Sequence, residues 1–256
     1  MRAWWELYKK EILALSFFTV VIFLALFAWE IFLFYKADKW IIWLAFGLSF
    51  VPFALYPILI LWLGYNSYRQ EWKDDTHYFL LSLPRRGWEI GLAKLAASMS
   101  FYIGISLVTL LMIFVFHHGF IRGMVIDNIY KNALEPGMFI GLAIRLLLAY
   151  WIHGLTLYIA AQFSQLVSLF YDRFRGLITI IVFSLFPYVV YRGAILLAPL
   201  FRWVPELSLG NFVYFEFGIP RIISLSIGSG PFVAYVLMIT AMFLLGSWLV
   251  EKHLEV

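Results

Sequence analysis

The first long apolar stretch of the chain, residues 12–35, reads ILALSFFTVVIFLALFAWEIFLFY and contains one ionisable side chain, Glu30. A helix of about 20 apolar residues is long enough to cross the roughly 30 Å hydrocarbon core of a bilayer. Residues 12–35 therefore predict a membrane-spanning helix. The stretch is too long for a cleavable signal peptide, and no small-residue cleavage site follows it.

Five further segments have the same apolar character. Together with the first they predict an all-α polytopic membrane protein with six transmembrane helices, at about residues 12–35, 40–65, 92–116, 138–170, 176–201 and 231–250. No polar stretch long enough for a soluble domain is left between them. Residues 1–256 are therefore predicted to form a single transmembrane domain.

The composition of the chain excludes several classes of protein. Hydrophobic residues make up 64% of the sequence and charged residues 13%, whereas a soluble domain has roughly 45–50% and about 25%. An ordinary soluble enzyme is excluded, and so is a nucleic-acid-binding module, because the net charge of +4 has almost no soluble surface to occupy. The absence of Cys excludes disulfides and thiolate metal sites.

The distribution of Lys and Arg predicts the orientation. If the N-terminus is cytoplasmic, the cytoplasmic loops hold Arg69, Lys73, Arg85 and Arg86, and they hold more basic residues than the outer loops. Cytoplasmic loops of membrane proteins carry an excess of Lys and Arg. Both termini are therefore predicted to be cytoplasmic in a multi-pass protein of the cell membrane.

The most specific pattern lies between the second and third predicted spans. Residues 71–84 read EWKDDTHYFLLSLP, and Glu89, Ile90 and Lys94 follow. Apolar residues recur at helical spacing from Tyr68 to Leu83, which predicts an amphipathic helix that Pro84 terminates. The simplest interpretation of such a helix is that it rests on the lipid headgroups.

This pattern resembles the corresponding loop of ABC-2 type permeases, the membrane subunits of many bacterial ATP-binding-cassette exporters. The matching positions are Glu71, Thr76, Leu80 to Pro84, Glu89, Ile90 and Lys94. Asp75 stands where the family usually has Gly. The resemblance implies that residues 68–83 form a coupling helix that contacts a separate ATPase subunit. The residues implied in this coupling are Glu71, Asp75, Thr76, Phe79 and Leu80.

The resemblance also implies a function. The chain would be a permease subunit that exports a hydrophobic or amphipathic substrate, assembled with an ABC ATPase and with a second permease copy or a related permease. No G-x-x-x-x-G-K-[ST] phosphate loop is present, so the chain is not expected to be an enzyme. ATP and Mg would be bound by the partner, and no cofactor or metal is expected in this chain. Two other classes stay open: an intramembrane enzyme acting on lipid or peptide, and a non-transporting immunity or sensor protein.

The ionisable residues that fall within the predicted spans, away from their very ends, are Glu30, Arg145, His153 and Arg192. Charged side chains are expensive in lipid and usually face a partner or a cavity. Three interpretations are open: an ion pair of Glu30 with one of the arginines, a polar lining at the outer end of an export path, or extension of the side chains to the headgroups. The adjacent His117 and His118, predicted in an outer loop, are poorly spaced for a metal site.

Two further segments carry weaker predictions. Trp4, Trp5, Tyr8 and Ile12 share one helical side, which predicts a short helix on the cytoplasmic membrane surface. The outer loop 202–230 contains apolar runs that are too short to span. Either short helices dip into the outer leaflet there, as in ABC-2 type exporters, or the loop lies at the interface.

Overall fold

The computed structural model describes residues 2–37, 40, 42–74, 86–132, 136–171, 173–216 and 219–253. Within these ranges the chain is mainly helical, and six helical segments are long and apolar enough to cross a membrane. The predicted all-α polytopic fold is confirmed. In lipid every backbone polar group needs an internal partner, so continuous apolar segments fold as helices.

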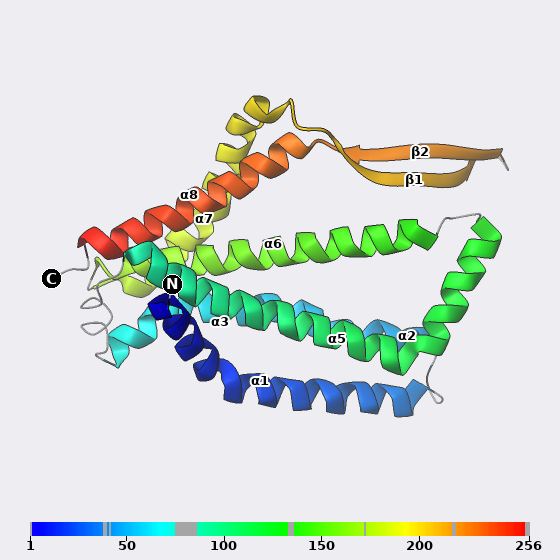
Figure 1. Cartoon of the computed structure of the whole chain (residues 1–256), viewed down its shortest axis with the longest axis horizontal. Helices are drawn as coiled ribbons and strands as arrows, with labels where there is room; N and C mark the ends of the chain where they lie inside the picture. Colours follow the sequence, from blue (N-terminus) through cyan, green and yellow to red (C-terminus); the bar gives the residue numbers. More distant parts are fainter. Residues whose placement is uncertain are drawn as a thin grey trace.

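The helices follow one another in an up-and-down order (Figure 1). They are α1 (Arg2–Ala37), α2 (Ile42–Leu48), α3 (Val51–Lys73), α5 (Gly87–Asn132), α6 (Pro136–Ser168), α7 (Arg175–Leu197) and α8 (Ser229–His253). A short 3-10 turn, Ala198–Phe201, extends α7. The start of α1 and the end of α8 lie at the same end of the molecule (Figure 1), which we call the terminal end.

The second membrane segment consists of two helices, α2 and α3, with a break at Ser49 and Phe50. Pro52 explains the break, because it has no N–H to donate to the carbonyl of Leu48 four residues earlier, and because a proline is tolerated in the first turn of a helix. The break takes Ser49 out of the regular helix. The predicted surface helix at the N-terminus is not separate either, since its residues belong to the continuous α1.

The third membrane helix is longer than the sequence predicts. The outer loop predicted for residues 117–137 is largely helical, because α5 continues to Asn132. The backbone of His117 (φ −113°, ψ 16°) is not helical, and the two arms of α5 meet there at a bend (Figure 1). The placement of His117 in a loop was therefore wrong, since helical geometry resumes directly after it.

The segment between α7 and α8 forms a β-hairpin, which excludes short helices, one of the two interpretations open for residues 202–230. Strands β1 (Leu207–Glu216) and β2 (Ile219–Ile227) pair antiparallel, with Asn211 opposite Ser224. β-Branched and aromatic residues are frequent in both segments and favour strands. The hairpin projects from the end opposite the termini (Figure 1).

The bundle is held by close helix contacts and interhelical hydrogen bonds. Helix α1 packs on α5, and α3 packs on α6. The Tyr150 hydroxyl of α6 donates to the Phe53 carbonyl of α3 at 2.9 Å. A Cβ added to Gly64 of α3 would lie 2.6 Å from the Tyr158 carbonyl oxygen of α6. Small residues let membrane helices approach in this way, because lipid supplies no hydrophobic force between them.

Candidate functional site

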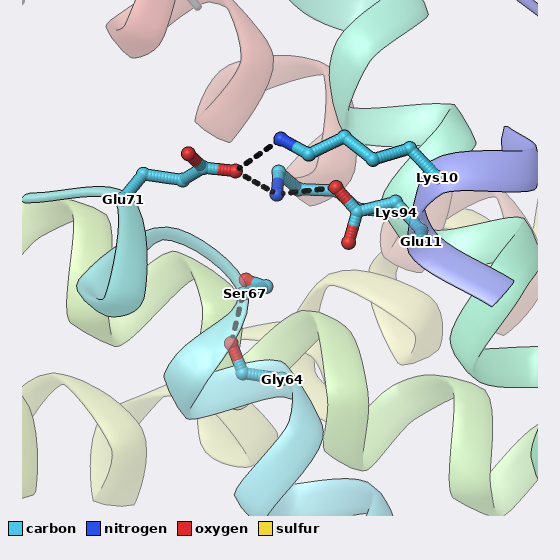
Figure 2. Close-up of polar contacts among 6 residues, drawn as sticks. All are labelled: Lys10, Glu11, Gly64, Ser67, Glu71 and Lys94. Atoms are coloured by element: carbon cyan, nitrogen blue, oxygen red, sulfur yellow. Dashed lines mark hydrogen bonds and ion pairs between the residues drawn. The ribbon is translucent and has the colours of Figure 1, made fainter. Parts of the chain in front are cut away.

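Four charged side chains join three helices at the terminal end of the molecule (Figure 2). Nζ of Lys94, on α5, lies 2.8 Å from Oε1 of Glu11 on α1 and 3.0 Å from Oε1 of Glu71 on α3. Nζ of Lys10 lies 3.4 Å from the same oxygen of Glu71. We call Lys10, Glu11, Glu71 and Lys94 the ion-pair cluster.

The centre of the ion-pair cluster is shielded from solvent. Lys94 is 4% exposed and Glu71 is 8% exposed, whereas Lys10 lies at the surface. Removing an ammonium group from water is expensive unless carboxylates replace its hydration. Because the two carboxylates come from α1 and α3, the charge of Lys94 fixes the position of both helices against α5.

A cavity of about 470 Å³ lies beside the ion-pair cluster, between α1 and α3. Its polar lining comprises the cluster together with Asn66, Ser67, Gln70, Asp74, Ser98 and Tyr158. Its apolar lining comprises Ala14, Leu15, Phe18, Trp62, Leu63 and Ala97. The volume falls within the range of roughly 300–1,000 Å³ typical of small-molecule sites.

The start of the predicted coupling helix has a different structure from the one expected. Residues 68–73 are the last turns of α3 rather than the start of a separate helix. Glu71 points into the ion-pair cluster (Figure 2) and is buried, so its carboxylate does not lie on an exposed face of α3, where a contact with an ATPase would need it. The partner of this carboxylate is Lys94, which lies on another helix. The helical periodicity of residues 68–83 contains no information about that contact. Asp75, Thr76, Phe79 and Leu80 lie outside the described residues.

A second buried polar cluster lies toward the opposite end of the molecule. Glu30 is 1% exposed, and the hydroxyl of Ser49 donates to its Oε2 at 3.1 Å. Nε2 of His117 lies 3.0 Å from the Ser49 hydroxyl and 3.7 Å from the same Glu30 oxygen. The helix break at Ser49 and the bend at His117 therefore meet at one carboxylate. We call Glu30, Ser49 and His117 the outer cluster.

The outer cluster corrects the predicted pairing of Glu30 with an arginine. Arg145, His153 and Arg192 are all exposed on the described surface of the chain. Nε of Arg192 donates to the Tyr188 hydroxyl one turn away at 3.4 Å, and its guanidinium lies over the Tyr188 ring. Glu30 finds its partners on α5 and at the α2–α3 break instead, because the helix irregularities there bring polar groups to it.

Several residues of these sites were not predicted from the sequence. Lys10, Glu11 and Ser49 carry no motif, and Tyr158 looks like one more aromatic of an apolar helix. A weak signal was available for Glu11, since it is the acidic residue that opens an otherwise apolar stretch. Of the described residues, no group of three or more His, Asp and Glu side chains is placed to hold a metal ion.

Comparison with known proteins adds no relative. No family model, curated protein or solved structure matches the chain significantly.

Proposed function

We propose that this chain is the permease subunit of an ATP-binding-cassette exporter in a bacterial cell membrane, with both termini in the cytoplasm. A separate ATPase subunit would bind ATP and Mg and supply the energy. A second permease, identical or related, would complete the membrane part. The transported substrate would be hydrophobic or amphipathic, because the described helices are overwhelmingly apolar.

One observation carries this proposal. Glu71 and Lys94 are the acidic and basic residues at the two ends of the pattern that resembles the ABC-2 coupling loop, and they form an ion pair at 3.0 Å. The pair joins the end of α3 to the start of α5. Any displacement of the intervening loop would therefore act on both helices together, as a coupling element requires.

The contact with α1 extends the proposed coupling to the N-terminus. Glu11 shares Lys94 with Glu71, so α1 is tied to the same point. A second contact joins the same two helices, because the Tyr8 hydroxyl of α1 lies 3.0 Å from the Ser100 hydroxyl of α5. A push from an ATPase on the loop after α3 would thus reach three membrane helices through one ammonium group.

The proposed export path has candidate polar residues. Arg145, His153 and Arg192 are exposed on membrane-length helices. Ionisable side chains within a membrane usually face a partner or a water-filled cavity rather than lipid. These three residues support a path along α6 and α7 that a second permease would enclose.

Copurification with an ATPase tests the proposal. The full chain, carrying an affinity tag, is expressed with the ATP-binding-cassette ATPase encoded nearest to it in its genome, and the retained ATPase is quantified. We expect the ATPase to be retained. We also expect Lys73→Glu, at the exposed end of α3, to weaken retention, and more strongly at low salt, since such contacts are electrostatic.

Arg202→Glu is the matched control. It makes the same charge reversal at an exposed position that follows α7 and the short 3-10 turn, away from the end of α3. It should leave retention unchanged. Glu71→Lys is unsuitable as a test, since it would place a third ammonium group in the ion-pair cluster and disturb the fold. Absence of the ATPase from purified unmodified permease would refute the proposal.

A further inference from the structure

The cavity between α1 and α3 has a defined length and two distinct ends. The Lys10–Glu71 ion pair (3.4 Å) bridges the two helices at the terminal end. The rings of Phe18 and Trp62, tilted by 39° to one another with centroids 5.8 Å apart, bridge them deeper in the bundle. Lys10 and Phe18 are eight residues apart on α1, so the cavity is about 12 Å long.

The lining of the cavity changes from charged to apolar along this length. Charged and amide groups, including Gln70 and Asn66, surround the terminal end, whereas Leu15, Phe18 and Trp62 line the deep end. Both Ala14 and Gln70 are exposed, so the cavity opens sideways between α1 and α3. An occupant must therefore be polar at one end and apolar at the other, and it can enter from the bilayer.

One buried group in the cavity lacks a close hydrogen-bond partner. Tyr158 is 0% exposed and lines the cavity, and its hydroxyl lies beside those of Ser67 and Ser98 without forming a close hydrogen bond. The neighbouring Ser67 hydroxyl donates to the Gly64 carbonyl at 2.7 Å (Figure 2). A buried hydroxyl without a partner is unfavourable. The Tyr158 hydroxyl is therefore available to a polar ligand atom.

The charges on the lining define the ligand further. The described lining carries two ammonium groups, those of Lys10 and Lys94, and three carboxylates, those of Glu11, Glu71 and Asp74. An anionic ligand would meet these three carboxylates, and a cationic one would meet the two ammonium groups. A zwitterionic group can place its positive end against the carboxylates and its negative end against the ammonium groups.

We propose that this cavity binds a zwitterionic phospholipid with a primary ammonium group, of the phosphatidylethanolamine type. Its ammonium group donates hydrogen bonds to the carboxylates and its phosphate faces Lys10. Its glycerol region reaches the Tyr158 hydroxyl, and an acyl chain passes Trp62. The site needs no ATPase, so it stands or falls independently of the exporter proposal.

Lipid binding by the delipidated full chain in detergent tests this site. Native mass spectrometry measures retention of added dioleoyl phosphatidylethanolamine, with the phosphatidylglycerol and phosphatidylcholine analogues for comparison. We expect one tightly retained phosphatidylethanolamine per chain and at least about tenfold weaker retention of the other two, corresponding to the loss of one or two hydrogen bonds. Equal retention of all three lipids would show non-specific annular lipid and overturn the proposal.

Two variants locate the binding. Ala14→Trp places a bulky side chain in the mouth of the cavity and should lower phosphatidylethanolamine retention by about tenfold or more. Leu13→Trp is the matched control, because Leu13 is the exposed neighbour of Ala14 and does not line the cavity. Retention that is equal in both variants would place the lipid elsewhere.

Tyr158→Phe separates a ligand contact from a structural one. It should weaken phosphatidylethanolamine retention by about three- to tenfold and leave the thermal stability of the lipid-free chain nearly unchanged, since the hydroxyl makes no close hydrogen bond within the protein. A variant that is less stable without lipid yet binds lipid normally would show that the hydroxyl serves the fold, and would overturn its assignment to the site.

Discussion

Lys94 is the residue on which the terminal end of the bundle depends. It is nearly fully buried, and its ammonium group is the common partner of Glu11 and Glu71. Lys94→Met keeps the length of the side chain but leaves two carboxylates facing one another. We expect the free energy of unfolding to fall by about 3–5 kcal/mol, the usual effect of leaving a buried charge without its partner.

Unfolding in detergent, followed by tryptophan fluorescence, measures this loss. Lys9→Met is the control, because Lys9 forms an exposed ion pair with Glu6 at 3.5 Å and such surface pairs contribute at most about 1 kcal/mol. Glu71→Gln should be intermediate, since Lys94 keeps Glu11. Equal stability of the Lys94 and Lys9 variants would contradict a structural role for the ion-pair cluster.

Glu30 provides the second test at this scale. Because Ser49 donates to its carboxylate, Glu30→Gln and Ser49→Ala should not be additive, and their coupling energy should be at least about 0.5 kcal/mol. Glu30→Gln and Arg192→Gln should be additive within about 0.5 kcal/mol, since the described contacts of Arg192 are with Tyr188. A double-mutant cycle for each pair in unfolding experiments measures both, and the reverse ranking would restore the arginine pairing.

Individual residues were the least predictable level of this structure. The resemblance of the loop singled out Glu71 and Lys94, but it did not show that they pair. The third member of the contact, Glu11, is 83 residues from Lys94 in the sequence. Periodicity reports which face of a helix a residue occupies, whereas the partner across the bundle depends on how helices pack.

At the scale of whole elements, contact between α3 and α6 depends on Gly64. Gly64→Ala should destabilise the protein by about 1–3 kcal/mol, because the added Cβ would lie 2.6 Å from the Tyr158 carbonyl oxygen, a backbone atom. Gly104→Ala is the matched control on α5, where nothing lies within 4 Å of the added Cβ. Alanine favours a helix over glycine by roughly 0.5–1 kcal/mol, so the control should be neutral or stabilising.

Thermal unfolding of the two glycine variants gives the answer directly. The melting temperature should fall for Gly64→Ala and should stay the same or rise for Gly104→Ala, so comparing the two removes any general effect of the glycine-to-alanine change. Shifts of the same sign would mean that α3 and α6 are farther apart than the described structure has them.

The elements differ in how far their sequences predict them. Apolar segments long enough to cross a bilayer were predictable, because a single segment in lipid can satisfy its backbone hydrogen bonds only as a helix. The continuation of α5 past His117 and the β1–β2 hairpin were not, since both lie in segments where length and hydrophobicity allow more than one structure. The β-branched and aromatic side chains of residues 207–227 favour strands and are the one sequence feature that indicates the hairpin.

At the scale of the whole molecule, the six membrane-length helices return the chain to the terminal end (Figure 1). If that end is cytoplasmic, a membrane-impermeant maleimide should not label Lys73→Cys in intact cells, and it should label Trp203→Cys, at an exposed position after α7. The Cys-free background makes each label unambiguous. Both variants should react after permeabilisation, and the opposite pattern in intact cells would invert the orientation.

The ion-pair cluster also has a consequence for biogenesis. Synthesis runs from the N-terminus, so Glu11 and Glu71 leave the ribosome before Lys94. When the ammonium group reaches the bilayer, both of its counter-charges are already there on inserted helices. The same order holds in the outer cluster, where Glu30 and Ser49 precede His117. In both clusters the basic residue is therefore synthesised after the groups that it contacts. A nascent chain that ends after α3 would contain Glu11 and Glu71 but not Lys94.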